Sequence, residues 1–230
     1  MAAATLRVLS YNVRSMRDDT EALASVIRQA EPDLVCVQEA PRFLRWRSKC
    51  AALARTSAMV VVTGGRPAGA MLLLARLGVD VHSTRDVLLS RTPGLHQRGL
   101  AIAEVSVGGS QVAVASMHLG LRADERLRHV DEVMAAMSRY EVPVVLAGDV
   151  NERPGEPAWS SLSETFQDSW LAAGNDPAGG LTYSSHAPYE RIDAVFADRR
   201  LSVLSCEVPS WPEVAKASDH RPVLSVLALP

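Results

Sequence analysis

The stretch that most strongly constrains the fold of this chain is a short apolar run that stops at an acid. It covers residues 142–151, with the sequence VPVVLAGDVN. Residues 144–147, VVLA, follow Pro143 and predict a strand buried on both faces, which is typical of parallel strands covered by helices. The strand ends in Gly148, followed by Asp149 and, two residues later, Asn151. Polar groups at the tip of a buried strand cost stability, so we interpret them as groups that serve chemistry.

The chain has the same order of elements twice. Residues 6–13 read as a strand, a helix with a capping box at Asp18 and Glu21 follows, and residues 34–37 form a second buried strand. In the second half, a strand over 112–117, a helix over roughly 124–139 and the strand over 144–147 repeat this order. A strand–helix–strand unit makes its two strands parallel, with their carboxyl ends on one edge. We therefore predict an α/β fold with two pseudo-equivalent sheets in one domain, residues 1–230.

The remaining segments predict shorter elements. We expect a helix over 42–55 with Phe43 facing inward, strands over 59–62, 70–75, 79–89 and 100–107 joined in part by hairpins, and short helices near 159–162 and 165–172. Strands over 189–197 and 201–208 precede a last strand that opens at 218–220 and runs through 229.

Composition restricts the class of protein. The chain is 47% hydrophobic and 22% charged, and no apolar run approaches the roughly 20 residues that span a bilayer. We expect a cytoplasmic monomer without integral membrane association, since the start shows no secretory signal pattern. The three cysteines lie far apart, which indicates neither a disulfide framework nor a thiolate zinc site. A net charge of −2 argues against non-specific electrostatic binding of nucleic acid by the whole protein surface. A local basic patch is still compatible with this net charge.

Polar residues fall at strand ends that this topology places on one edge. They are Asn12, Glu39, His118, Asp149, Asn151, Asp193, Asp219 and His220. Each residue alone is typical of an ordinary loop, so the prediction depends on their convergence where ligands of open α/β sheets bind. Four carboxylates at one edge repel, by on the order of 4 kcal/mol for a pair at about 4 Å and an effective dielectric near 20. A hard cation such as Mg²⁺ or Mn²⁺ would offset that repulsion.

Six short motifs, in this order, resemble the signature of the endonuclease/exonuclease/phosphatase superfamily, also called deoxyribonuclease I-like. They are YNV at 11–13, QE at 38–39, HL at 118–119, GDVN at 148–151, RID at 191–193 and SDH at 218–220. The resemblance implies a four-layer α/β sandwich of two central mixed sheets flanked by helices, and metal-dependent hydrolysis of phosphoesters. In the nuclease branch an acidic residue orients the first histidine, whereas Gly99 lies near that position here, which weakens the assignment to that branch.

The resemblance also implies the metal site and the base. Glu39 would hold Mg²⁺ or Mn²⁺, with Asn12 and Asp219 completing or supporting its shell. The cation would polarise a phosphoryl oxygen and stabilise the leaving oxyanion. Asp149 would orient and deprotonate the attacking water.

The other site residues would act on the phosphoryl group or on each other. Asn151 and His118 would donate hydrogen bonds to the phosphoryl oxygens. Asp193 would fix the tautomer of His220 and favour its charged form. In-line attack by water then needs no covalent intermediate.

The substrate stays open at this stage, because the superfamily acts on nucleic acids, phospholipid head groups, sugar or inositol phosphates and nucleotides. We favour a nuclease or small phosphodiesterase, with Arg122 and Arg153 as substrate-binding residues and Arg42, Arg45 and Arg126 as further candidates for a basic rim. The alternatives are a phosphomonoesterase, a sphingomyelinase-like phospholipid phosphodiesterase, and a phosphate-binding module without catalysis.

Overall fold

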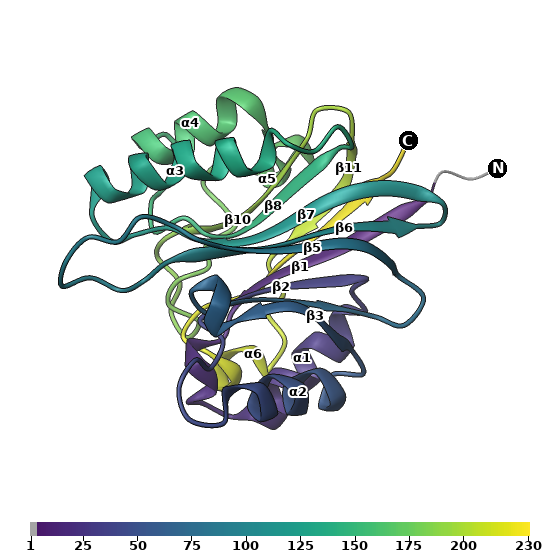
Figure 1. Ribbon diagram of the computed structural model, residues 1–230, viewed down its shortest axis with the longest axis vertical. Helices are drawn as coiled ribbons and strands as arrows, with labels where there is room; N and C mark the ends of the chain where they lie inside the picture. The colour runs from purple at the N-terminus through teal and green to yellow at the C-terminus, as the bar shows by residue number, and fades with distance from the viewer. Residues whose placement is uncertain (1–3) are drawn as a thin grey trace.

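The computed structural model describes residues 4–230, which form four layers (Figure 1). One outer layer contains α1 (Thr20–Ala30), α2 (Trp46–Thr56) and α6 (Val214–Ala217). The opposite layer contains α3 (Ala123–Met137), α4 (Pro157–Thr165) and α5 (Ser169–Ala172). Two six-stranded sheets lie between the helices. The predicted α/β sandwich with two central mixed sheets is therefore confirmed.

The first sheet has the strand order β11-β12-β1-β2-β4-β3. Its strands are β11 (Ser202–Glu207), β12 (Val223–Ala228), β1 (Thr5–Asn12), β2 (Leu34–Gln38), β4 (Met71–Ala75) and β3 (Val60–Gly65). β1 and β2 are parallel, as the strand–helix–strand pattern predicts, and the other neighbours are antiparallel. Short 3-10 turns, η1 (Arg14–Met16) and η2 (Arg66–Ala68), follow β1 and β3.

The second sheet has the order β5-β6-β7-β8-β10-β9. Its strands are β5 (Asp80–Leu88), β6 (Gly99–Val107), β7 (Ser110–His118), β8 (Val144–Asp149), β10 (Asp193–Ala197) and β9 (Gln167–Asp168). Here β7 and β8 form the parallel pair, and the hairpins β5–β6 and β6–β7 are antiparallel. Each sheet thus has one central parallel pair whose carboxyl ends carry polar residues.

Three apolar clusters hold the layers together. Leu6, Val8, Val114 and Val145 belong to the cluster between the two sheets. A second cluster packs α1 and α2 on the first sheet, and a third packs α3 and α4 on the second sheet. Apolar burial on both faces of each sheet explains why the central strands read as continuous hydrophobic runs.

Two helix starts differ from the prediction. α2 begins at Trp46, and Phe43 is 76% exposed, so the predicted helix over 42–55 with Phe43 inward is wrong at its start. The reason is Arg45, whose φ of 57° is left-handed and interrupts helical geometry before Trp46. Helix α1 is capped by Asp19, whose carboxylate accepts hydrogen bonds from the amides of Glu21 and Ala22, and not by a box at Asp18.

The carboxyl-terminal elements are shorter than predicted. The segment 165–172 is not one helix, because β9 precedes α5 and the Asp168 side chain caps α5 through Trp170 N. Strand β10 begins at Asp193 and β12 at Val223, so the segments 189–192 and 218–222 are largely loop. No helix within residues 4–230 is long and apolar enough to cross a membrane.

Candidate active site

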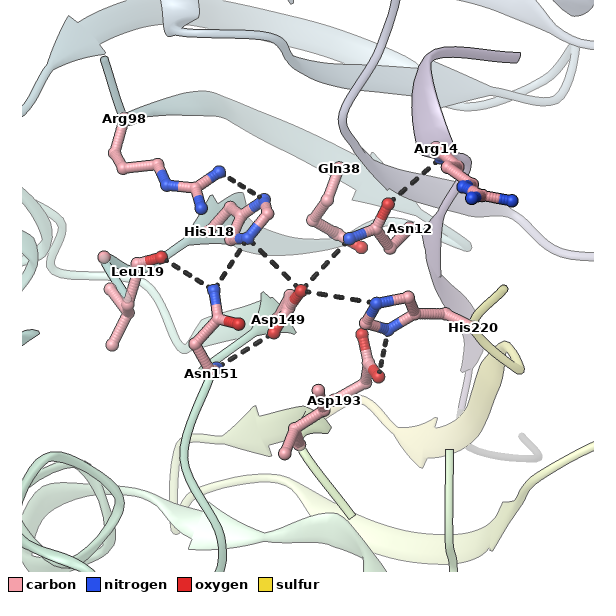
Figure 2. Close-up of polar contacts among 12 residues, drawn as sticks. Asn12, Arg14, Gln38, Arg98, His118, Leu119, Asp149, Asn151, Asp193 and His220 are labelled. Atoms are coloured by element: carbon pink, nitrogen blue, oxygen red, sulfur yellow. Dashed lines mark hydrogen bonds and ion pairs between the residues drawn. The ribbon is translucent and has the colours of Figure 1, made fainter. Parts of the chain in front are cut away.

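The ends of both parallel pairs and the starts of two antiparallel neighbours meet at one edge (Figure 2). Asn12 ends β1, His118 ends β7 and Asp149 ends β8. His118 and Asp149 are register partners in the parallel pair, and Asp193 is the antiparallel partner of Asp149. The predicted convergence of these side chains therefore follows from strand register.

Asp149 lies at the centre of the contacts. Its Oδ2 accepts a hydrogen bond from Asn12 Nδ2 at 3.0 Å and lies 3.2 Å from His118 Nε2, while Oδ1 accepts from the backbone N of Asn151 at 2.9 Å. The side chain is buried, and burial, together with the charge of nearby Asp193, raises the pKa of Asp149 to about 7. A carboxylate with such a pKa is suited to accept a proton near neutral pH.

Asp193 and His220 form a buried pair beside Asp149. His220 Nδ1 donates to Asp193 Oδ2 at 2.8 Å, and His220 Nε2 lies 3.9 Å from Asp149 Oδ2. Burial opposes a charge on the imidazole, but the charge and hydrogen bond of Asp193 more than offset it and raise the pKa of His220 to about 10. The pair therefore holds a charged imidazole with Nε2 directed toward Asp149.

The close packing of β7 against β8 explains why a glycine, Gly148, precedes Asp149 at the tip of β8. A Cβ at this position would lie 1.9 Å from the backbone oxygen of Met117, its register partner on β7. The close approach of β7 and β8 at this point needs a residue without a side chain. The glycine thus sets the separation of His118 and Asp149 at the two strand ends.

Arg98 is a site residue that the sequence did not predict. Its Nη1 lies 3.0 Å from His118 Nδ1, and Arg98 is 8% exposed. Because a guanidinium only donates, Nδ1 must accept, which leaves the proton on Nε2 facing Asp149. The Asn151 amide nitrogen, 2.9 Å from Nε2, donates instead to Leu119 O at 3.0 Å. Burial and the charge of Arg98 hold the pKa of His118 well below its usual value, so this imidazole is neutral.

Asp219, predicted as a metal ligand, is held by cationic and hydroxyl neighbours. Its Oδ2 pairs with Arg14 Nε at 3.2 Å, and its Oδ1 lies 3.4 Å from Ser218 Oγ. Ser218 Oγ donates its proton to the backbone oxygen of Asn12 at 2.7 Å. These contacts place Asp219 next to the end of β1, as the motif order implied.

Glu39 fits a hard cation better than its neighbours do. Its half-buried carboxylate accepts no hydrogen bond and forms no ion pair within residues 4–230. The backbone oxygen of Glu39 accepts from Ser15 N at 2.8 Å, which brings the end of β2 against the segment after Asn12. Asp149, Asp193 and His220 also have ligand atoms within 4.8 Å of one another, but hydrogen bonds already occupy them in part. Carboxylate and amide oxygens suit Mg²⁺ or Mn²⁺.

The two arginines predicted to bind substrate are both neutralised by acids. Arg122 pairs with Asp124 at 3.0 Å, and Arg153 pairs with Glu190. Both arginine side chains are exposed. Their role in substrate binding stays a prediction, and neither arginine offers an unpaired charge to an anion.

Comparison with known proteins gives a family and a set of similar structures. The model of the Endonuclease/Exonuclease/phosphatase family matches residues 9–220. A search among curated proteins returned no significant match.

Three similar solved structures share the fold. An endonuclease/exonuclease/phosphatase from Beutenbergia cavernae is 26% identical, with a TM-score of 0.77 over 98% of this chain and 72% of that chain. A mannosyl-6-phosphatase from Bacteroides thetaiotaomicron is 18% identical, with a TM-score of 0.81 over 97% of this chain and 100% of that one. TDP2 from C. elegans is 19% identical, with a TM-score of 0.75 over 99% and 77% of the two chains.

Proposed function

Because the chain belongs to the Endonuclease/Exonuclease/phosphatase family, we propose that it is a divalent-metal-dependent phosphoesterase that hydrolyses a phosphodiester by direct attack of water. The observation that carries this proposal is the position of Asp149. Asp149 is a buried carboxylate with a raised pKa that accepts a hydrogen bond from Asn12. It lies beside the neutral imidazole of His118 and the charged imidazole of His220. Such a group activates water without forming a covalent intermediate.

The neighbours of Asp149 have complementary tasks. His220, charged through Asp193, donates from Nε2 to a phosphoryl oxygen and stabilises its negative charge. His118 carries its proton on Nε2 and holds Asp149 in place while remaining uncharged. Asn151, fixed by Leu119, positions its amide at the same edge. Preorganised donors of this kind lower the barrier because they need no rearrangement during reaction.

Glu39 would hold the cation, and Asn12 and Asp219 would support it. Glu39 is the acid at this edge whose carboxylate no donor within the described residues satisfies. When bound, Mg²⁺ or Mn²⁺ supplies Lewis-acid stabilisation of the phosphoryl and leaving oxygens.

The choice between a diester and a monoester depends on what lies beyond the scissile phosphate. The similar structures include a mannosyl-6-phosphatase and TDP2, which at this identity share only the fold. An arginine-lined pocket beside Glu39 supports a substrate that extends past one phosphate. A phosphomonoesterase and a sphingomyelinase-like lipid phosphodiesterase remain the alternative activities.

A substrate panel tests the proposal. The purified protein is assayed with Mg²⁺, with Mn²⁺ and with chelator against bis-p-nitrophenyl phosphate, abasic and single-stranded DNA, RNA, sphingomyelin and sugar phosphates. We expect metal-dependent release of product from at least one phosphodiester, and none in chelator. Absence of hydrolysis of every ester with both ions would instead support a phosphate-binding module without catalysis.

A further inference from the structure

Two adjoining pockets lie beside Glu39 and share four lining residues. The smaller, about 280 Å³, contains Glu39 itself, together with Ser15, Arg17 and Arg98. The larger, about 730 Å³, extends away from it along Arg45, Arg66 and Arg91. The shared residues are Arg42, Phe43, Gly69 and His96. A volume of this size accommodates a group much larger than one phosphate.

The charge of the larger pocket is not neutralised. Its four arginines are Arg42, Arg45, Arg66 and Arg91, and among the described residues that line it there is no aspartate or glutamate. None of these arginines forms an ion pair within residues 4–230, whereas Arg122, Arg126 and Arg153 each pair with an acid. An arginine cluster without acidic partners is suited to bind an anion, and the guanidinium geometry matches phosphate.

The pocket wall also offers apolar and aromatic surface. Phe43 is 76% exposed and Leu88 is 54% exposed. The Arg42 guanidinium lies 5.2 Å from the centre of the Phe43 ring, and its Nη2 contacts His96 Nδ1 at 3.1 Å. An exposed ring beside a guanidinium provides a stacking surface for a planar group that carries phosphates.

We propose that this arginine pocket binds a second phosphate of the substrate, so that the natural substrate carries at least one phosphate besides the scissile one. The inference rests on the proposed function, since it assumes that the scissile phosphate lies between Glu39 and Asp149. A strand of nucleic acid and a small bisphosphate both supply this chemistry, and the two arms of the test below distinguish them.

Binding is measured with the Asp149→Asn protein in Mg²⁺, so that no ligand is consumed. The first arm titrates oligothymidylates with one to four phosphates, and the second compares fructose 6-phosphate with fructose 1,6-bisphosphate. Each arm is repeated in a background that adds Arg45→Gln, Arg66→Gln and Arg91→Gln. Arg139→Gln removes one exposed arginine after α3 that forms no ion pair within residues 4–230, and it serves as the control for loss of a single surface charge away from the pocket.

We expect affinity to rise at least about tenfold on addition of the second phosphate in one arm, and this gain to disappear in the triple variant but not in the control. A gain only in the first arm identifies a nucleic acid strand as the source, and a gain only in the second identifies a small bisphosphate. Equal affinity for one and two phosphates in both arms, or a gain that survives in the triple variant, overturns the proposal. Because this experiment measures only ligand affinity, failure of the second-phosphate proposal can be distinguished from failure of the proposed function, which would appear as absence of hydrolysis in the substrate panel.

Discussion

Arg98 Nη1 lies 3.0 Å from Nδ1 of His118 and thereby determines which nitrogen of the imidazole carries the proton. An acidic partner at Nδ1 would accept a proton from the imidazole and favour its charged form. Here the partner is a cation, so the histidine is neutral and donates from Nε2 toward Asp149. The two imidazoles beside Asp149 therefore differ in charge, since Asp193 keeps His220 protonated.

Replacement of Arg98 tests this assignment. In Arg98→Met, His118 Nδ1 loses its donor, and we expect the Nδ1–H tautomer to become populated and kcat to fall roughly 10- to 100-fold. Nitrogen chemical shifts of His118 measure the tautomer directly. Arg98→Lys keeps a charged donor, so it should preserve more of the Nε2–H tautomer of His118 and more of kcat than Arg98→Met does. An unchanged tautomer in Arg98→Met would show that Arg98 does not position His118.

Replacement of Asp193 should change the protonation of His220. The raised pKa of His220, about 10, depends chiefly on the charge and hydrogen bond of Asp193, while the charges of Asp149 and Asp219 add to it and burial opposes it. In Asp193→Asn we therefore expect the pKa of His220 to fall well below 10. A histidine NMR titration of the metal-free protein measures this shift. If His220 still titrated near 10 in the variant, Asp193 would not be the cause of its charge.

The same pair predicts how stability changes with pH. Because the folded pKa of His220 lies above the unfolded one, its contribution to the free energy of unfolding is fully present below about pH 6.5 and is lost as pH rises toward about 10. Chemical denaturation between pH 6 and 10 should show a steeper loss of stability in the wild type than in His220→Gln. Parallel curves for the two proteins would contradict the linkage.

Gly148 should tolerate no side chain. The Cβ of Gly148→Ala would meet the backbone oxygen of Met117 at 1.9 Å, so β7 and β8 must separate at the tip, with an expected loss of about 3 kcal/mol of stability. The control Gly155→Ala adds a Cβ with no atom within 4 Å, at a φ of 86°, and should cost only about 1 kcal/mol. Urea denaturation measures the loss of unfolding free energy in each variant. Equal losses in Gly148→Ala and Gly155→Ala would argue that the close approach of β7 and β8 is not the reason for a glycine at position 148.

Removal of the Glu39 carboxylate should weaken cation binding. In Glu39→Gln we expect the Mg²⁺ concentration for half-maximal activity to rise at least about tenfold, while stability without metal changes little, since no donor within residues 4–230 bonds this carboxylate. Mg²⁺ titration of activity and of thermal unfolding gives both quantities. Glu31→Gln, an exposed acid after α1, is the control. An unchanged Mg²⁺ requirement would remove Glu39 from the metal site.

The fold was predictable because its decisive features are local in sequence. Apolar runs at 34–37 and 144–147 specify buried strands, and the helices that precede them make each pair parallel. The polar residues at strand tips then converge by register alone, as Asp193 opposite Asp149 illustrates.

The parts that the sequence did not predict depend on contacts between distant segments. The contact of Arg98 with His118 joins residues 20 positions apart through the β6–β7 hairpin, and no local pattern marks it beyond the neighbouring Gly99. Likewise, the exposure of Phe43 follows from the left-handed turn at Arg45, which hydrophobic periodicity does not record. The arginine pocket arises only when the segment after β2 lies beside the loop before β6.

The most direct test of the proposed chemistry is the turnover of Asp149→Asn on the best phosphodiester of the panel at saturating Mg²⁺. The amide keeps the size of the side chain but cannot accept a proton from water, so we expect kcat to fall by about 10²- to 10⁴-fold. Near-UV circular dichroism and the unfolding midpoint serve to confirm that the variant is folded. A folded Asp149→Asn protein with kcat within a few-fold of the wild type would contradict the account, because Asp149 could then not be the base.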